Sequence, residues 1–214
     1  MRCALNSQVD NYGWVKDQCI HSHSYIQPII VETCRSLGVR RVLDLGCGKG
    51  DIAGALAEAG FDVVGCDADV EGIRLAALAY PKARFVHTGV YDDPASFGDD
   101  RFDAVVSTEV IEHLFAPRAL PRFASQVLKP GGRLIVTTPY HGYVKNLMLA
   151  VTNHWDRHLS PLWDGGHIKF FSRQTLEQLL TESGFTVREF RGLGRFPLVW
   201  KSMLLVAQKN QSNE

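Results

Sequence analysis

The sequence lacks several features that would each point to a distinct class of protein. Its five cysteines form no CxxC pair and have no metal-binding spacing. We therefore expect free thiols in a reducing compartment. The opening residues, MRCALNSQVD, lack the apolar core of a secretory signal, and no apolar run approaches the roughly 18 residues of a membrane span. These absences predict a cytoplasmic protein.

An excess of charge of either sign is also missing. Lys+Arg and Asp+Glu each number 23. Proteins that bind nucleic acid through its phosphates are usually more basic, so the balance argues against nucleic acid as a partner. With 214 residues and 45% hydrophobic content, the chain suits a single domain with a complete core, residues 1–214. Composition leaves the oligomeric state open.

Short β-rich runs alternate with helical segments from about residue 41. Such alternation favours a parallel sheet with helices on both faces. The link between the last two strands is too short for a helical crossover, so we expect them to form an antiparallel hairpin at the sheet edge. The prediction is an α/β, Rossmann-like, doubly wound seven-stranded sheet, mostly parallel with an antiparallel last strand. The predicted strands are 41–45, 61–66, 83–88, 102–107, 132–138, 185–190 and 199–209.

Two segments lie outside this alternation. Residues 1–40 precede the first strand and predict an N-terminal helical cap. Residues 140–171 form an insertion rich in His, Trp, Gly and Asp, and we expect them to form a lid that contacts substrate, because ligands bind at the carboxyl ends of such strands. Its stretch GYVKNLMLAVTNHW predicts a helix with one apolar face. That face would close the active site or, alternatively, make a peripheral contact with a membrane surface.

The most specific motif is VLDLGCGKGD, which follows one strand and opens a helix. Its glycines let the backbone turn sharply and approach a ligand closely. Asp51 stands where a dinucleotide motif needs glycine, and Gly50 stands where a P-loop needs Ser or Thr. Asp44 suits a ligand with a cationic amino-acid end. Asp67, which ends the next strand, can accept hydrogen bonds from ribose hydroxyls.

The blocks DLGCGKG, FDAVVSTEVIEHL and LKPGGRLIVTTP, with Asp67, resemble class I S-adenosylmethionine-dependent methyltransferases. The likeness covers about residues 40–208 and implies a methyltransferase with S-adenosylmethionine as cofactor. It implies that the glycines contact the methionine half, that Asp67 holds the ribose, and that residues after strands two to four border the adenine and methionine. The cofactor-binding candidates are Asp44, Gly46, Gly48, Gly50, Asp67, Ala68, Val90, Thr108 and Glu109.

Within that class the chain is similar to the ubiquinone-biosynthesis O-methyltransferases. The shared features are E-x-x-E-H, the inserted helix and a G-x-H at Gly165–His167. The resemblance implies O-methylation of a small-molecule, phenol-like hydroxyl. Enzymes that methylate nucleobases commonly carry a Pro-Cys dipeptide or an Asp/Asn-Pro-Pro-aromatic motif after strand four. This sequence has neither motif, which argues against a nucleobase substrate. The alternatives are a catalytically inactive S-adenosylmethionine-binding regulatory protein, or N- or C-methylation of a small molecule.

The segment TEVIEHL, residues 108–114, carries two carboxylates and an imidazole. On a helix, Glu109, Glu112 and His113 would share one face at positions i, i+3 and i+4. In the ubiquinone-type relatives similar residues are implicated in binding a divalent cation, and this set would suit Mg²⁺ or Zn²⁺. Alternatively, His113 is a general base held by a carboxylate such as Glu112, or the segment only orders a helix start. His141 and His167 are further base candidates.

Overall fold

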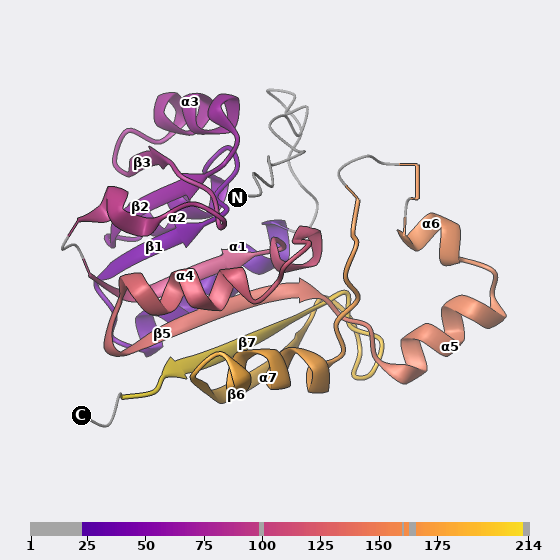
Figure 1. The fold of residues 1–214 in the computed structure, drawn as a ribbon. Helices are drawn as coiled ribbons and strands as arrows, with labels where there is room; N and C mark the ends of the chain where they lie inside the picture. The colour runs from indigo at the N-terminus through magenta and orange to yellow at the C-terminus, as the bar shows by residue number, and fades with distance from the viewer. Residues whose placement is uncertain (1–22, 99–100, 160, 163–165, 212–214) are drawn as a thin grey trace, which may run out of the picture.

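The computed structural model describes residues 23–98, 101–159, 161–162 and 166–211 (Figure 1). Its centre is a seven-stranded sheet with the order β3-β2-β1-β4-β5-β7-β6. The pairs among β1 to β5 are parallel, whereas β7 is antiparallel to both β5 and β6. The predicted fold class is therefore confirmed. The strands are β1 Arg41–Leu45, β2 Asp62–Asp67, β3 Arg84–His87, β4 Phe102–Thr108, β5 Leu128–Pro139, β6 Phe185–Leu193 and β7 Ser202–Lys209.

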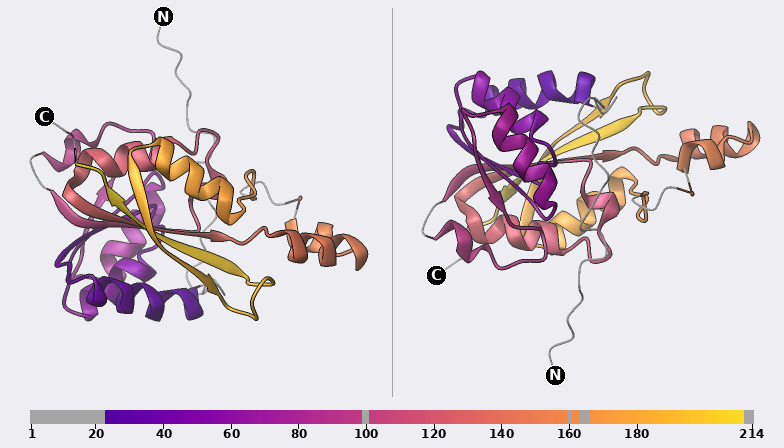
Figure 2. Two further views of the ribbon diagram at one scale, coloured as in Figure 1. Left: turned by 90° about the horizontal axis from the view of Figure 1, so that it is seen from below. Right: turned by 90° about the horizontal axis from the view of Figure 1, so that it is seen from above.

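Helices cover both faces of the sheet, as Figure 2 shows from two sides. On one face, Ile30 of α1 and Leu56 of α2 share a core with the sheet. On the other, Phe123 of α4 and Leu180 of α7 belong to a second core. Helix α3 contacts α2, β2 and β3. The α-helices that pack on the sheet are α1 His23–Ser36, α2 Asp51–Glu58, α3 Val70–Ala79, α4 Ala119–Val127 and α7 Arg173–Glu182. A short 3₁₀ helix, η1, spans Pro94–Phe97.

Parallel pairing brings the carboxyl ends of the five strands β1 to β5 to one edge. In the register of β1 and β2, Leu45 lies beside Cys66, and in that of β4 and β5, Thr108 lies beside Thr137. The glycine loop, Asp67, the TEVIEHL segment and the start of the insertion all follow these ends. The sheet thus gathers the candidate site residues at one edge, where ligands of such sheets bind.

The insertion contains two helices, α5 (Tyr143–Val151) and α6 (Trp155–Leu159), which extend beyond the carboxyl edge of the sheet (Figures 1 and 2). The helix expected within GYVKNLMLAVTNHW is therefore present. Its apolar face is exposed in this structure, with Tyr143 80% and Val151 78% accessible. Among the described residues, no helix is long and apolar enough to cross a membrane.

Only part of the expected N-terminal cap falls within the described residues. Helix α1 occupies His23–Ser36, as a helix before the first strand requires. Residues 1–22 lie outside the described residues, as does Gly165 of the G-x-H motif.

The helical geometry expected for TEVIEHL is wrong. Only Ile111–His113 form a helical turn, a 3₁₀ element called η2, and Glu109 has a φ of 55°. The Glu109 amide donates to the Thr137 carbonyl at 3.1 Å, so residue 109 still belongs to the β4–β5 pairing. Val110 then packs against Gly46. An α-helix cannot begin at residue 109 because its backbone is committed to the sheet and to this turn.

Candidate functional site

Steric contacts and backbone hydrogen bonds fix the conformation of the glycine loop. Gly46 has a φ of +81°, and a Cβ there would lie 2.5 Å from Cγ2 of Val110. The amides of Gly46 and Cys47 donate to the Cys66 carbonyl at 2.8 and 3.0 Å, which fastens the loop to the end of β2. Glycine is therefore needed at position 46 both for its conformation and for the close approach of Val110.

Asp67 is held directly against this loop. Its Oδ2 accepts from the Gly48 amide at 2.8 Å and its Oδ1 from the Asp69 amide at 2.9 Å. Burial raises the pKa of Asp67, while the hydrogen bonds from Asp69 and Gly48 oppose that rise. Each carboxylate oxygen has a further lone pair, so the group is oriented and can still accept hydrogen bonds from a diol.

The residues expected at the adenine lie together after β2 and β3. A Cβ built on Gly89 would lie 2.8 Å from the Cβ of Ala68, so the two loops touch. The Asp92 carboxylate accepts from the Gly89 amide at 2.7 Å and fixes the turn, and Val90 beside it is buried. This gives the wall next to Asp67 an apolar surface.

The surroundings of Asp44 indicate whether the loop suits the expected cofactor. Its side chain is fully buried, and neither carboxylate oxygen has a hydrogen-bond partner among the described residues. Burial raises its pKa to about 7, and the nearby backbone amide of Ala53 offsets only part of that rise. A buried carboxylate without a partner is costly, and an ammonium group would satisfy it. The ammonium of a methionine moiety supplies that charge, so Asp44, Asp67 and the glycines fit S-adenosylmethionine.

Glu109 follows the buried Thr108 at the end of β4, and its side chain links this strand to β7 and, through Ser202, to α1. Its Oε2 accepts from the Ser202 hydroxyl at 3.3 Å, and that hydroxyl lies 3.0 Å from the Tyr25 hydroxyl. Its Oε1 has no partner among the described residues, and burial raises its pKa to about 7. Sequence reasoning missed Ser202, because nothing near the start of the last strand marks that serine as different from a surface residue.

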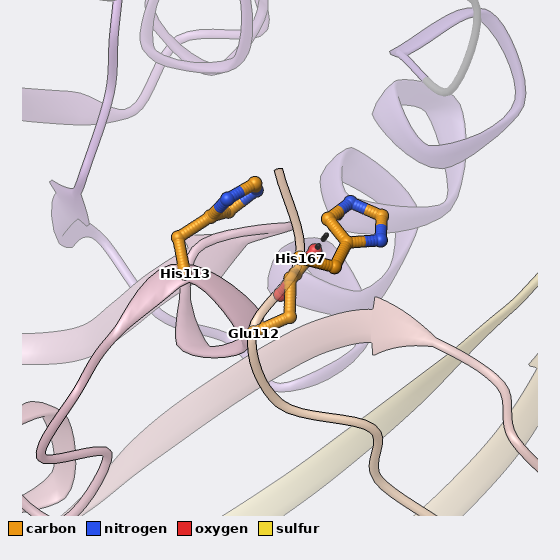
Figure 3. Close-up of side chains that lie close together, drawn as sticks. All are labelled: Glu112, His113 and His167. Atoms are coloured by element: carbon orange, nitrogen blue, oxygen red, sulfur yellow. Dashed lines mark ion pairs between the residues drawn. The ribbon is translucent and has the colours of Figure 1, made fainter. Parts of the chain in front are cut away.

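The end of the insertion is fastened onto η2. The Glu112 carbonyl accepts from the amides of Ile168 and Lys169, both at 2.9 Å. The Gly166 carbonyl lies 3.2 Å from Nδ1 of His113. This docking places His167 above Glu112 and beside His113 (Figure 3).

Glu112, His113 and His167 form a compact group. One ligand atom from each lies within 4.8 Å of the others. Nε2 of His167 is 4.0 Å from Oε1 of Glu112, and the two imidazole rings pack edge to face at 4.9 Å. His167 thus takes the place that helical spacing had assigned to Glu109 in the candidate ligand set, because Glu109 turns to Ser202 instead.

Burial governs the protonation of this group. It raises the pKa of Glu112 well above its ordinary value, and the nearby Glu109 raises it further, although Thr138 donates to Oε2 at 3.0 Å. Burial and the charge of His113 lower the pKa of His167 to about 4. His167 is therefore neutral at pH 7 and can donate a lone pair to a cation or accept a proton.

His141 lies in a separate environment. Its ring packs 5.4 Å from that of His158 and 5.1 Å from that of Phe170. Burial lowers the pKa of the His141 ring to about 4, and a hydrogen bond with the Asn146 side chain only partly opposes that shift. The structure therefore brings His113 and His167 together with Glu112 and leaves His141 outside that group.

Comparisons with known proteins agree with this geometry. A family described as "Methyltransferase domain" matches residues 22–189. The ubiquinone biosynthesis O-methyltransferase of Cereibacter sphaeroides is 30% identical over 75% of this chain, and the match covers 66% of that relative. The protein of the same name from Hydrogenovibrio crunogenus is 26% identical over 90% of this chain and 83% of its own length.

Solved structures show the same fold. A magnesium protoporphyrin IX methyltransferase from Synechocystis, with bound SAH, has a TM-score of 0.69 and 17% identity, over 93% of this chain and 91% of that one. A SAM-dependent methyltransferase from Methanosarcina mazei has a TM-score of 0.63 and 26% identity, over 80% and 93%. The chain therefore belongs to the methyltransferase family, with S-adenosylmethionine as its cofactor.

Proposed function

We propose that the protein methylates a hydroxyl oxygen of a small, phenol-like molecule. The observation that carries this proposal is the group of Glu112, His113 and His167 at the carboxyl end of β4, next to Thr108 and Glu109. A phenol is a poor nucleophile until it loses its proton. A carboxylate and two imidazoles are the kind of group that can promote that loss. The names of the two relatives also favour a hydroxyl acceptor.

Bound S-adenosylmethionine supplies an electrophilic methyl group on its sulfonium. The task of this chain is to hold the acceptor in line with that methyl group, to exclude water and to remove the hydroxyl proton. We expect Thr108, Glu109 and the segment that carries His167 to border the space in which this reaction takes place.

We propose that the group acts by holding a divalent cation. Two imidazoles with one carboxylate are a donor set found in catalytic zinc sites, which keep one position open. A cation would favour the ionised form of Glu112, whose Oε1 has no hydrogen-bond partner among the described residues. It would lower the pKa of a coordinated hydroxyl. The competing mechanism has His113 or His167 accept the proton directly, with Glu112 as the orienting group.

The test uses full-length protein with S-adenosylmethionine and catechol, and detects methyl ether by mass spectrometry. We expect EDTA to abolish turnover and Zn²⁺, Mn²⁺ or Mg²⁺ to restore it. Glu112→Gln should lower kcat/KM by about 100-fold or more, since it removes the only carboxylate of the group, while the Kd for S-adenosylmethionine changes little.

The matched control is Glu177→Gln, which removes a surface carboxylate of α7 that pairs with Arg173. It should leave both constants unchanged. Turnover that survives EDTA but fails in Glu112→Gln would support the proton-acceptor mechanism. Full activity of Glu112→Gln, or methylation of amines alone across an acceptor panel, would contradict the proposed function.

A further inference from the structure

Helix α5 has an inverted pattern of burial. Its apolar side chains Tyr143, Leu147 and Val151 are 80%, 50% and 78% exposed. Lys145 on the same helix is only 7% exposed and is the only one of its residues that is buried. A lysine is rarely buried unless it meets an anion. The burial of Lys145 in place of an apolar neighbour therefore calls for a chemical explanation.

Lys145 has too few partners to account for its burial. Its Nζ donates one hydrogen bond, at 3.3 Å, to the Lys201 carbonyl. An ammonium group has three donors, so two of them lack a partner of this kind. None of the ion pairs found within 4 Å in the described parts of the chain includes Lys145.

The charges around Lys145 are mostly basic. Burial lowers the pKa of Lys145 to about 8, the charge of Arg195 lowers it further, and only Glu109 acts in the opposite direction. Burial lowers the pKa values of His141 and His158, and the positive charge of Lys145 lowers them further. Glu109 is itself engaged by the Ser202 hydroxyl. Among the described residues that influence Lys145, basic groups therefore outnumber acidic ones.

Lys145 is connected to the proposed reaction site through the start of β7. The Lys201 carbonyl that accepts from Lys145 immediately precedes Ser202, whose hydroxyl donates to Glu109 at the end of β4. We infer that the acceptor carries a carboxylate, and that Lys145 binds this carboxylate while the hydroxyl of the same molecule lies at Glu112, His113 and His167. The inference rests on the proposed function and specifies its substrate class as a hydroxylated aromatic acid.

The experiment compares two acceptors that differ only in the carboxylate, 3,4-dihydroxybenzoate and catechol. We expect wild-type kcat/KM to favour 3,4-dihydroxybenzoate by about tenfold or more, the effect of one favourable charge contact. Lys145→Met, which keeps the side-chain length, should abolish that preference. Lys145→Arg should retain part of it, because the charge remains.

Arg157→Met is the matched control, because it removes an exposed charge from α6 of the same insertion. It should keep the wild-type preference. Equal wild-type rates for the two acceptors, or an unchanged preference in Lys145→Met, would overturn the inference while leaving the proposed function intact. A tenfold loss of S-adenosylmethionine affinity in Lys145→Met would also overturn it, since the lysine would then serve the cofactor.

Calorimetry separates the two proposals where no methylation occurs. Protein loaded with S-adenosylhomocysteine is titrated with 3,4-dihydroxybenzoate and with catechol. Binding of the acid that is lost in Lys145→Met supports the carboxylate site even if neither compound is methylated, in which case the proposed function alone fails for phenols. Absence of any preference for the acid in this titration contradicts the carboxylate site.

Discussion

Two regions of this molecule satisfy their polar groups in different ways. The cofactor side is the glycine loop with Asp44 and Asp67, which we expect to hold S-adenosylmethionine. The acceptor side is the TEVIEHL segment with the insertion, which we propose to hold the methyl acceptor. On the cofactor side, Asp67 and the glycine loop are held by backbone hydrogen bonds from Gly48, Gly46 and Cys47. Among the described residues of this side, the carboxylate oxygens without a hydrogen-bond partner belong to Asp44. On the acceptor side, the partnerless atoms come from separate elements. In the part of the chain that the structure describes, they are Oε1 of Glu109, which follows β4, and Oε1 of Glu112 in η2.

The difference reflects how each side is built. The cofactor side uses short motifs at the ends of adjacent parallel strands, so neighbours in sequence complete one another. The acceptor side depends on an insertion that returns to η2 through hydrogen bonds between residues more than 50 positions apart. A local motif can be self-sufficient, whereas the long-range site is left with polar groups that a ligand can satisfy.

We expect the largest effect from a substitution at Gly46, which would disrupt the glycine loop of the cofactor side. Gly46→Ala places a Cβ 2.5 Å from the branched side chain of Val110, which has little freedom to move, and at a φ of +81°. We expect a loss of about 2–5 kcal/mol in the free energy of unfolding and at least a tenfold weaker affinity for S-adenosylmethionine. Chemical denaturation and calorimetry measure the two effects.

Gly60→Ala serves as the control, because Gly60 has a φ of +94° but no atom near the position of a Cβ. It should cost only about 1–2 kcal/mol of stability and leave cofactor affinity unchanged. Equal stability losses in the two variants would show that the contact with Val110 does not constrain the loop.

A smaller effect, with opposite signs for stability and binding, is expected at Asp44. Burial raises its pKa from 3.8 to about 7, so its contribution to stability is fully present below pH 4 and is lost as the pH rises through 7. Asp44→Asn removes the loss of folding stability at high pH, because the side chain no longer ionises. We expect the cofactor-free variant to melt about 2–4 °C higher than wild type at pH 8, and to bind S-adenosylmethionine at least about tenfold more weakly.

Differential scanning fluorimetry between pH 5 and 8, with and without cofactor, follows both effects of Asp44→Asn. The exposed Asp156 provides the control, since Asp156→Asn should change neither the melting temperature nor the affinity. Tighter cofactor binding by Asp44→Asn would refute the pairing of this carboxylate with an ammonium group.

The smallest effect is expected on the acceptor side, at the apolar face of α5. Leu147 is 50% exposed, so Leu147→Ala should change the free energy of unfolding by no more than about 0.5 kcal/mol. Leu176 of α7 is fully buried, and Leu176→Ala should cost about 2–5 kcal/mol. A loss above about 1.5 kcal/mol in Leu147→Ala would mean that the α5 face is covered in solution.

Sequence patterns predicted most of the sheet because burial on both faces selects continuous apolar runs. The strand predicted at 41–45 matches β1, and the one at 102–107 matches β4 to within one residue. The strand predicted at 132–138 begins earlier, at Leu128, because the turn residues KPGG extend β5. Helix α6 was not predicted, because a helix of five residues is too short to show a recognisable helical periodicity in the sequence.

The sequence by itself determined the cofactor side of this protein. Its glycines, Asp44 and Asp67 occupy fixed offsets from strand ends, and the pairing of parallel strands converts those offsets into positions in space. Only the tertiary structure decided the acceptor side. The commitment of Glu109 to the β4–β5 pairing excludes the helix expected at TEVIEHL, and the docking of the insertion on the Glu112 carbonyl brings His167 into the group instead. These contacts depend on where a long loop returns, which no local pattern encodes.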